Sequence, residues 1–275
     1  MNLEKTWRIS SKLLFDTNKK PIMMGILNCT PDSFSDGGKY NSIEQAYKKA
    51  CRLIDDGAHI IDIGGESTRP GASIVDPASE QVRILEVIKK LAQDKKCLIS
   101  VDTYKSTTAM LALESGANII NDVCGLHNSD MMAEIIASFS AAVIIMHTNR
   151  GRVSKDDIVE DVKYFFDKAI NKAIIAGISD QYIALDPGFG FGKDPQTNME
   201  LFRRIDELDS FTYPFVAATS RKGFLGKITG VNKPSDRDPA TVATSVMLRN
   251  KGFSIFRVHD VVSNKQALDI YDELK

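Results

Sequence analysis

Short apolar runs alternate with longer helical patterns along this chain, and this alternation restricts the fold more than any other feature. Eight runs rich in Ile, Val, Leu and Met end at or beside a polar residue: 22–27, 59–63, 97–101, 118–120, 142–146, 182–185, 214–218 and 254–258. Helical patterns lie between and after them, at 42–56, 77–93, 106–115, 130–138, 156–176, 198–208, 239–251 and 264–274. Strictly alternating strands and helices predict a parallel sheet, and eight pairs close it into a (β/α)8 TIM barrel of the α/β class.

Residues 7–20 predict an additional hairpin that turns at Asp16-Thr17-Asn18 and closes the bottom of the barrel. Glycines follow three predicted helices, where a left-handed cap residue is favoured: Gly57, Gly116 and Gly177. At 275 residues the chain has the usual length of one such barrel. Because no repeat, linker or low-complexity segment divides it, we expect a single domain over residues 1–275.

Charge and composition limit the partners of the protein. The formal charge is −1, so the chain has no excess field to attract nucleic acid or a membrane surface. No stretch approaches the roughly 18 apolar residues of a membrane span, and the N-terminal residues contain no secretory signal pattern. The four cysteines share no CxxC spacing, which is typical of a reduced protein. We therefore expect a cytoplasmic protein with no nucleic-acid or membrane partner.

Polar side chains at the ends of the predicted strands form a first candidate site. The C-terminal strand ends of a barrel face its active site, so Asp102, Asn121 and Asp186 should converge there, together with Lys222. Two carboxylates, an amide and an ammonium suit a flat heterocycle that carries both donors and acceptors. Each residue alone could instead cap the following helix, as Asp102 would do well. The four together favour ligand binding.

A second group of residues suits an anion. It comprises segment 67–71 after the second strand, segment 220–223 after the seventh, and Arg257 with His259 on the eighth. Phosphate sites in these barrels often follow strands 7 and 8. Arg257 and His259 are two residues apart on a strand and so face the same way, and Arg257 can also stack on a ring. Within the first segment, Arg69 is the strongest candidate for anion binding.

Other motifs narrow the chemistry. Segment 186–193 is glycine-rich but fits neither GxxxxGK[ST] nor GxGxxG, so its glycines are expected to let the backbone approach a flat ligand, with Phe191 as one wall. The four histidines form no HExxH motif or Cys/His cluster, which disfavours zinc. Mg²⁺ held by Asn28, water and substrate phosphates fits the preference of that ion. No GxSxG elbow or Ser-His-Asp set indicates a covalent hydrolase.

Eight segments of the chain closely resemble those of the dihydropteroate synthase family, and they occur in the same order. They are GILNCTPDSFSDGG, DIGGESTRPGA, SVDTYK, INDV, MH, LDPGFGFGK, SRKGFLG and RVHDV, from Met24 to Val261. Any one segment is a weak signal, whereas all eight in order are highly specific. The family belongs to folate biosynthesis and is the target of sulfonamides. The resemblance implies that 6-hydroxymethyl-7,8-dihydropterin pyrophosphate and p-aminobenzoate are joined to give 7,8-dihydropteroate and pyrophosphate.

The resemblance also implies a role for each matching residue. The pterin ring would be bound by Asp102, Asn121, Phe191, Asp186, Lys222 and Arg257, and the pyrophosphate by Asn28, Thr68, Arg69 and His259. Contacts to p-aminobenzoate would come from Phe34, Thr68 and Gly223, and Asn28 would contact Mg²⁺. Catalytic roles are implied for Asp36, Arg69, Asp102, Lys222 and His259. The resemblance implies a homodimer packed through the last helices. It also implies that pyrophosphate leaves before the arylamine attacks, a reaction order that needs no enzyme nucleophile.

Two positions and one segment depart from the usual pattern of the family. Ala218 replaces a Gly beside the pterin pocket, and its methyl group narrows that pocket in our interpretation. Gly223 replaces a Ser that helps to hold the carboxylate of p-aminobenzoate. Residues 148–151 differ from the expected Met-containing continuation.

Three alternative functions remain at this stage. A pterin methyltransferase of the same superfamily shares the Asp/Asn pocket but does not need segments STRP and SRKG, which are present here. A pterin-binding paralogue without turnover stays open because of Gly223. A generic phosphosugar barrel is disfavoured, because two Asp and an Asn facing a Lys exceed what a sugar phosphate requires.

Overall fold

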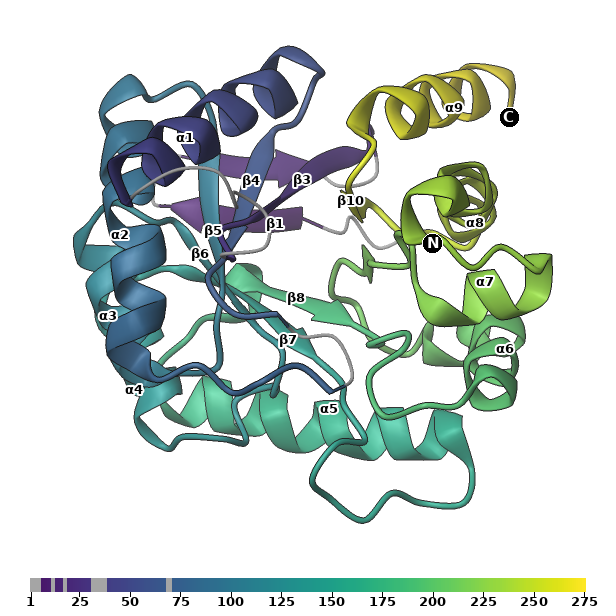
Figure 1. Cartoon of the computed structure of the whole chain (residues 1–275). Coiled ribbons are helices and arrows are strands. Elements are labelled where there is room, and N and C mark those ends of the chain that lie inside the picture. Colours follow the sequence, from purple (N-terminus) through teal and green to yellow (C-terminus); the bar gives the residue numbers. More distant parts are fainter. Residues whose placement is uncertain (1–5, 11–12, 17–18, 31–38, 68–70) are drawn as a thin grey trace.

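A closed barrel of eight parallel strands forms the centre of the protein (Figure 1). The computed structural model describes residues 6–10, 13–16, 19–30, 39–67 and 71–275. The strands are β3 (Ile22–Asn28), β4 (Ile60–Gly64), β5 (Leu98–Asp102), β6 (Ile119–Asp122), β7 (Ala142–Met146), β8 (Ile183–Asp186), β9 (Val216–Ala217) and β10 (Ile255–Val258). They pair in the order β8-β7-β6-β5-β4-β3-β10-β9, and a bridge between Leu185 and Phe215 joins the two ends. The predicted TIM barrel is confirmed.

Helices surround the sheet and follow the predicted alternation with two exceptions. They are α1 (Lys39–Asp55), α2 (Pro77–Asp94), α3 (Ser106–Glu114), α4 (Met131–Ser138), α5 (Ile158–Ile175), α6 (Pro195–Arg203), α7 (Gly223–Thr229), α8 (Asp238–Asn250) and α9 (Val261–Leu274). Short 3-10 turns lie at η2 (Asp180–Tyr182), η3 (Ile205–Leu208) and η4 (Pro234–Arg237). None of the described helices is both long enough and apolar enough to cross a bilayer.

The two exceptions have local causes. The predicted helix 198–208 is divided into α6 and η3, and it begins earlier because Asp194 accepts a hydrogen bond from the Thr197 amide (2.7 Å) ahead of Pro195. Helix α7 was not predicted, because glycines in so short a segment give little helical signal. The predicted left-handed caps are confirmed by the positive φ angles of Gly57, Gly116 and Gly177.

The N-terminal hairpin closes the bottom of the barrel, as predicted, but its turn was placed wrongly. Strand β1 (Thr6–Ser10) pairs antiparallel with β2 (Leu13–Asp16), so the chain reverses between Ser10 and Leu13. The turn predicted at Asp16-Thr17-Asn18 is wrong, because β2 continues to Asp16. Trp7 is fully buried and donates from Nε1 to the carbonyl oxygen of Tyr182 at 3.1 Å. The hairpin therefore serves as an apolar base for the barrel.

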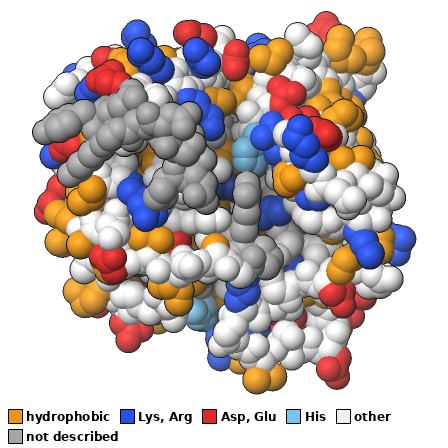
Figure 2. Space-filling model, in the orientation of Figure 1, with side chains coloured by type: hydrophobic (Ala, Val, Ile, Leu, Met, Phe, Trp, Pro, Cys, Tyr) orange, Lys and Arg blue, Asp and Glu red, His pale blue; other side chains and the backbone are white. Residues whose placement is uncertain are grey.

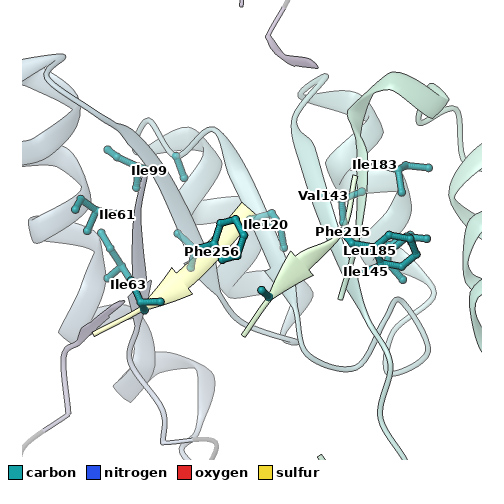
Figure 3. Packing of buried hydrophobic residues seen from close by; sticks show 14 of the residues in the cluster. Ile61, Ile63, Ile99, Ile120, Val143, Ile145, Ile183, Leu185, Phe215 and Phe256 are labelled. Carbon is teal, nitrogen blue, oxygen red and sulfur yellow. The ribbon is translucent and has the colours of Figure 1, made fainter. Parts of the chain in front are cut away.

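Two apolar layers lie on opposite sides of the strands. The outer layer includes Ile61 and Ile63 of β4 (Figure 3), which belong to one cluster with buried residues of the surrounding helices. The inner layer includes Ile60 and Met24, which pack with Trp7 inside the barrel. Because side chains of a strand alternate between its two faces, each barrel strand contributes to both layers.

Candidate active site

The side chains that point into the barrel change from apolar to polar along several strands. In four strands, an apolar residue of the inner layer is followed two positions later by a polar residue. These pairs are Ile60 and Asp62 of β4, Ile119 and Asn121 of β6, Ala184 and Asp186 of β8, and Ile255 and Arg257 of β10. Asp102 of β5 lies beside Asn121 in the sheet register. The barrel therefore builds a polar layer directly above its apolar floor.

Arg257 is at the centre of this polar layer. Its Nε donates to Asp62 Oδ2 at 2.7 Å, and its Nη2 donates to Asp102 Oδ2 at 2.7 Å. Asn121 donates to the same oxygen of Asp62 at 3.3 Å. Burial alone would lower the pKa of Arg257, but the two carboxylates raise it above its usual range. The guanidinium therefore stays charged and is held in one orientation.

Three buried acceptors of the layer have no hydrogen-bond partner within the described part of the chain. They are Asp62 Oδ1, Asp102 Oδ1 and Asn121 Oδ1. Leaving a buried polar atom unpaired costs about 1–3 kcal/mol. Because all three atoms are acceptors, the layer is suited to a ligand that brings N–H donors.

Burial also shifts the titration of the carboxyl groups. It raises the pKa of Asp102 to about 7, against the opposing effect of Arg257. It raises the pKa of Asp186 as well, although the Gly188 amide donates to Asp186 Oδ1 at 2.7 Å. A ligand that donates hydrogen bonds to these groups favours their ionised forms.

An aromatic wall borders the polar layer. The ammonium of Lys222 lies 4.1 Å from the centre of the Phe191 ring, and the guanidinium of Arg150 lies 4.6 Å from the same centre. Phe191 packs with Val123 and Met146. Burial lowers the pKa of Lys222 to about 8. A flat ligand can therefore be bound through its edge by the carboxylates and through its face by the wall.

Positive side chains surround the middle of the face shown in Figure 2, next to the grey atoms of residues that are not described. His259 follows β10, and its Nδ1 lies 2.9 Å from Ser220 Oγ, which also accepts from the His259 amide at 3.1 Å. The hydroxyl can then donate to Nδ1, which favours a proton on Nε2 of the neutral ring. Asn28 ends β3 at the same edge of the barrel.

The comparisons with known proteins agree with this geometry. The family described as pterin binding enzyme matches residues 24–259. A dihydropteroate synthase of Streptococcus pyogenes is 42% identical over 265 residues, which cover 96% of this chain and 98% of that protein. The chain belongs to the dihydropteroate synthase family.

Solved structures of dihydropteroate synthases have the same fold. The enzyme of Clostridium difficile, determined in the presence of pteroic acid, is 45% identical with a TM-score of 0.91, and the match covers 94% of this chain and 98% of that one. The enzyme of Xanthomonas albilineans, determined with 4-aminobenzoic acid, is 35% identical with a TM-score of 0.92, and the match covers 99% and 98%. Both likenesses extend over nearly the whole barrel.

The structure brings together most of the residues that resemble those of dihydropteroate synthases. Asp102, Asn121 and Arg257 lie together in the polar layer, and Phe191 and Lys222 lie together in the wall; their binding roles stay predictions. Phe34, Asp36, Thr68 and Arg69 lie outside the described residues, so their positions and roles stay predictions.

Asp62 is a residue of the polar layer that the sequence analysis missed. It is fully buried and contacts both Arg257 and Asn121. The candidate residues were those nearest to the predicted strand ends, and Asp62 lies two positions before Gly64, the last residue of β4. An acidic residue inside the apolar run IIDIG, in phase with Ile60, was the signal that could have identified it.

Two departures from the family pattern have a clear structural setting. Ala218 is almost fully buried and packs within the inner apolar layer with Met24 and Val216. Gly223 is the first residue of α7, and a Cβ atom added there would meet nothing within 4 Å. The space that a larger residue would need at this position is therefore open.

Proposed function

We propose that this protein is an active dihydropteroate synthase, which condenses 6-hydroxymethyl-7,8-dihydropterin pyrophosphate with p-aminobenzoate. The observation that supports it most directly is the set of unpaired acceptors at Asp62, Asp102 and Asn121, held around Arg257. A reduced pterin presents an amino group and ring N–H groups along one edge, and these are the donors that the polar layer lacks. Membership of the family supplies the reaction.

In this proposal the pterin binds between the polar layer and the wall. Asp102, Asn121 and Asp186 accept hydrogen bonds from its edge, while Lys222 donates to a ring oxygen or nitrogen. The planar guanidinium of Arg257, fixed by two carboxylates, stacks on the face of the ring. Orientation of the pterin fixes the direction in which its methylene group points.

The pyrophosphate of the substrate extends toward Asn28 and His259, and we propose that Thr68 and Arg69 also hold it. His259 can offer Nε2–H because Ser220 occupies Nδ1. The described residues contain no group of three or more His, Cys, Asp or Glu able to hold a metal. The amide oxygen of Asn28 fits Mg²⁺ only as one ligand among water and phosphate oxygens, which is a common arrangement for this ion. When bound, Mg²⁺ would neutralise charge on the pyrophosphate.

The reaction proceeds by departure of pyrophosphate before attack. The C–O bond between the pterin methylene and the pyrophosphate breaks, and its electron pair leaves with the phosphate. The cation that remains is conjugated with the pterin ring, and the ionised carboxylates of Asp102 and Asp186 stabilise it electrostatically. The amino nitrogen of p-aminobenzoate forms the new C–N bond and releases a proton. We propose that Asp36 and Arg69 help to exclude water from the cation.

In this proposal the p-aminobenzoate lies outside the pterin, beyond the polar layer. We propose that Phe34, Thr68 and backbone groups at Gly223 contact it. Backbone amides at Gly223, the first residue of α7, would hold its carboxylate. Gly223 itself offers no hydroxyl group, so this carboxylate is held by one contact fewer than a Ser would allow.

We also propose a homodimer packed through the last helices. Helices α8 and α9 lie side by side (Figure 1). Exposed apolar side chains occur on α7, α8 and α9 at Ile228, Met247 and Ile270. Light scattering of the purified protein measures the predicted mass of two chains.

The free state of all four cysteines supports a location in the reducing cytoplasm.

The decisive experiment measures pyrophosphate release from the pterin pyrophosphate in the presence of Mg²⁺. Release that depends on p-aminobenzoate supports the synthase. Pterin binding without release would show a paralogue that has lost turnover, and would overturn the proposal. The Asp102→Asn variant should lose most of the activity, because it removes a carboxylate from the polar layer. The matched Asp236→Asn variant changes an exposed carboxylate and should behave as wild type.

A further inference from the structure

Lys193 is a buried lysine that has no role in the binding scheme above. Its side chain lies inside the loop that follows β8 and is 8% exposed. The ammonium donates to the carbonyl oxygen of Gly188 at 2.8 Å. Burial lowers the pKa of Lys193 to about 7, with Asp186 opposing this shift. Burying an ammonium is costly, so this position demands an explanation.

The carbonyl oxygen of Gly188 connects Lys193 to the aromatic wall. It accepts a second hydrogen bond from the amide of Phe191 at 3.1 Å. The hydrogen bond that closes the turn before Phe191 therefore shares its acceptor, the Gly188 carbonyl oxygen, with the ammonium of Lys193. This turn places the Phe191 ring next to Lys222. Loss of the ammonium would leave this turn with one hydrogen bond at that oxygen.

The amide of Gly188 connects Lys193 to the polar layer. It donates to Asp186 Oδ1 at 2.7 Å, while Asp186 Oδ2 accepts no hydrogen bond from the residues described. Gly188 has a φ of +68° and lies against the backbone of His147, whose carbonyl oxygen would be 1.8 Å from an added Cβ atom, so its two peptide groups have little room to move separately. A shift of the Gly188 carbonyl therefore moves its amide, and with it the carboxylate of Asp186.

The backbone of Lys193 is anchored independently of its side chain. Buried Asn198 of α6 donates to the carbonyl oxygen of Lys193 at 2.9 Å and accepts from the amide of Gly190 at 2.6 Å. The loop is therefore held at both ends by Asn198. Among the described residues, the ammonium of Lys193 hydrogen-bonds to the loop only at the carbonyl oxygen of Gly188. Replacing the Lys193 side chain should therefore not release the loop as a whole.

We propose that Lys193 is a positioning residue for the pterin half of the site, which fixes Asp186 and Phe191 through the two peptide groups of Gly188. The inference rests on the proposed synthase function. It predicts that Lys193 affects binding of the pterin far more than binding of p-aminobenzoate, because neither group that it positions belongs to the p-aminobenzoate carboxylate site.

The test compares Lys193→Met with wild type. Methionine is of similar length and fits an apolar environment, but it cannot donate to Gly188. Calorimetry with 6-hydroxymethylpterin should show affinity weakened by about tenfold, the effect of losing one or two aligned hydrogen bonds. The KM for the pterin pyrophosphate should rise, and the KM for p-aminobenzoate should change little. The control is Lys233→Met, which replaces an exposed lysine.

A second variant separates positioning from support of the fold. Lys193→Gln keeps a neutral donor and should recover part of the pterin affinity. Wild-type affinity in Lys193→Met would overturn the inference, as would equal rises in both KM values. If both variants fail to fold, Lys193 supports the barrel and the inference is wrong. Failure of the wild-type protein to bind pterin or release pyrophosphate would instead contradict the proposed function.

Discussion

Arg257 and Asp62 form a buried ion pair across the inside of the barrel, with Nε and Oδ2 2.7 Å apart. The pair joins β10 to β4 over the intervening β3, and the second arm of the guanidinium reaches Asp102 on β5. One side chain thus holds three strands in a fixed relation. It also presents a planar cation whose orientation is set before any ligand binds, which reduces the ordering that binding requires.

The first prediction concerns Asp62. In Asp62→Asn the side chain keeps its shape but loses the charge that holds Arg257. We expect the free energy of unfolding to fall by about 1.5–3 kcal/mol, the value of a hydrogen bond between charged groups. Pterin affinity should fall as well, because Arg257 retains only Asp102. Denaturant titration and calorimetry measure the two effects, and Asp236→Asn is the exposed control. Unchanged pterin affinity would exclude Asp62 from the binding site.

The second prediction concerns pH. The pKa of Asp102 is raised from 3.8 to about 7 by burial, and the pterin needs its ionised form as an acceptor. The affinity for a pterin should therefore be highest above pH 7. Below pH 7 the affinity should decrease, with a slope that approaches about tenfold per pH unit. Calorimetry from about pH 5.5 to about pH 8.5, roughly 1.5 units on either side of this pKa, measures the change. In Asp102→Asn the affinity should be low throughout, with the step near pH 7 absent. A step of the same size in that variant would exclude Asp102 as its origin.

The strands could be predicted well because each apolar run ends at or beside a polar residue near the mouth of the barrel. Asp102, Asn121 and Asp186 were found in this way, and the structure places them on three different strands around one polar layer. Their convergence follows from the barrel topology alone. No precise distance was needed to infer it.

The features that were missed depend on neighbours that are distant in sequence. Asp62 has a partner 195 positions away, and only the closed sheet brings Arg257 to it. The hairpin turn was assigned to Asp16-Thr17-Asn18 because those residue types favour turns. Burial of Trp7 beneath the barrel fixes the pairing instead. The role proposed for Lys193 rests on its hydrogen bond to the carbonyl oxygen of Gly188, and no residue pattern in the sequence reveals this contact.

The third prediction tests the base of the barrel. Trp7→Ala removes a fully buried indole and its hydrogen bond to Tyr182, so we expect a loss of about 3–5 kcal/mol in unfolding free energy. Pterin affinity of the folded protein should stay unchanged, because the apolar floor separates Trp7 from the polar layer. Leu14→Ala, at a half-exposed position, should change stability by less than about 0.5 kcal/mol. A large loss of affinity in Trp7→Ala would show that the hairpin shapes the site.

The fourth prediction concerns Gly223, where the family usually has Ser. A Cβ atom at this position meets nothing within 4 Å, so Gly223→Ser should fold as well as wild type. The added hydroxyl should lower the KM for p-aminobenzoate by about three- to tenfold, the range for one neutral hydrogen bond. The KM for the pterin pyrophosphate should not change, since Gly223 lies outside the polar layer. Gly223→Ala adds the same Cβ without the hydroxyl and is the matched control. If Ala and Ser have equal effects, the hydroxyl has no part in binding, and the carboxylate is held by backbone amides alone.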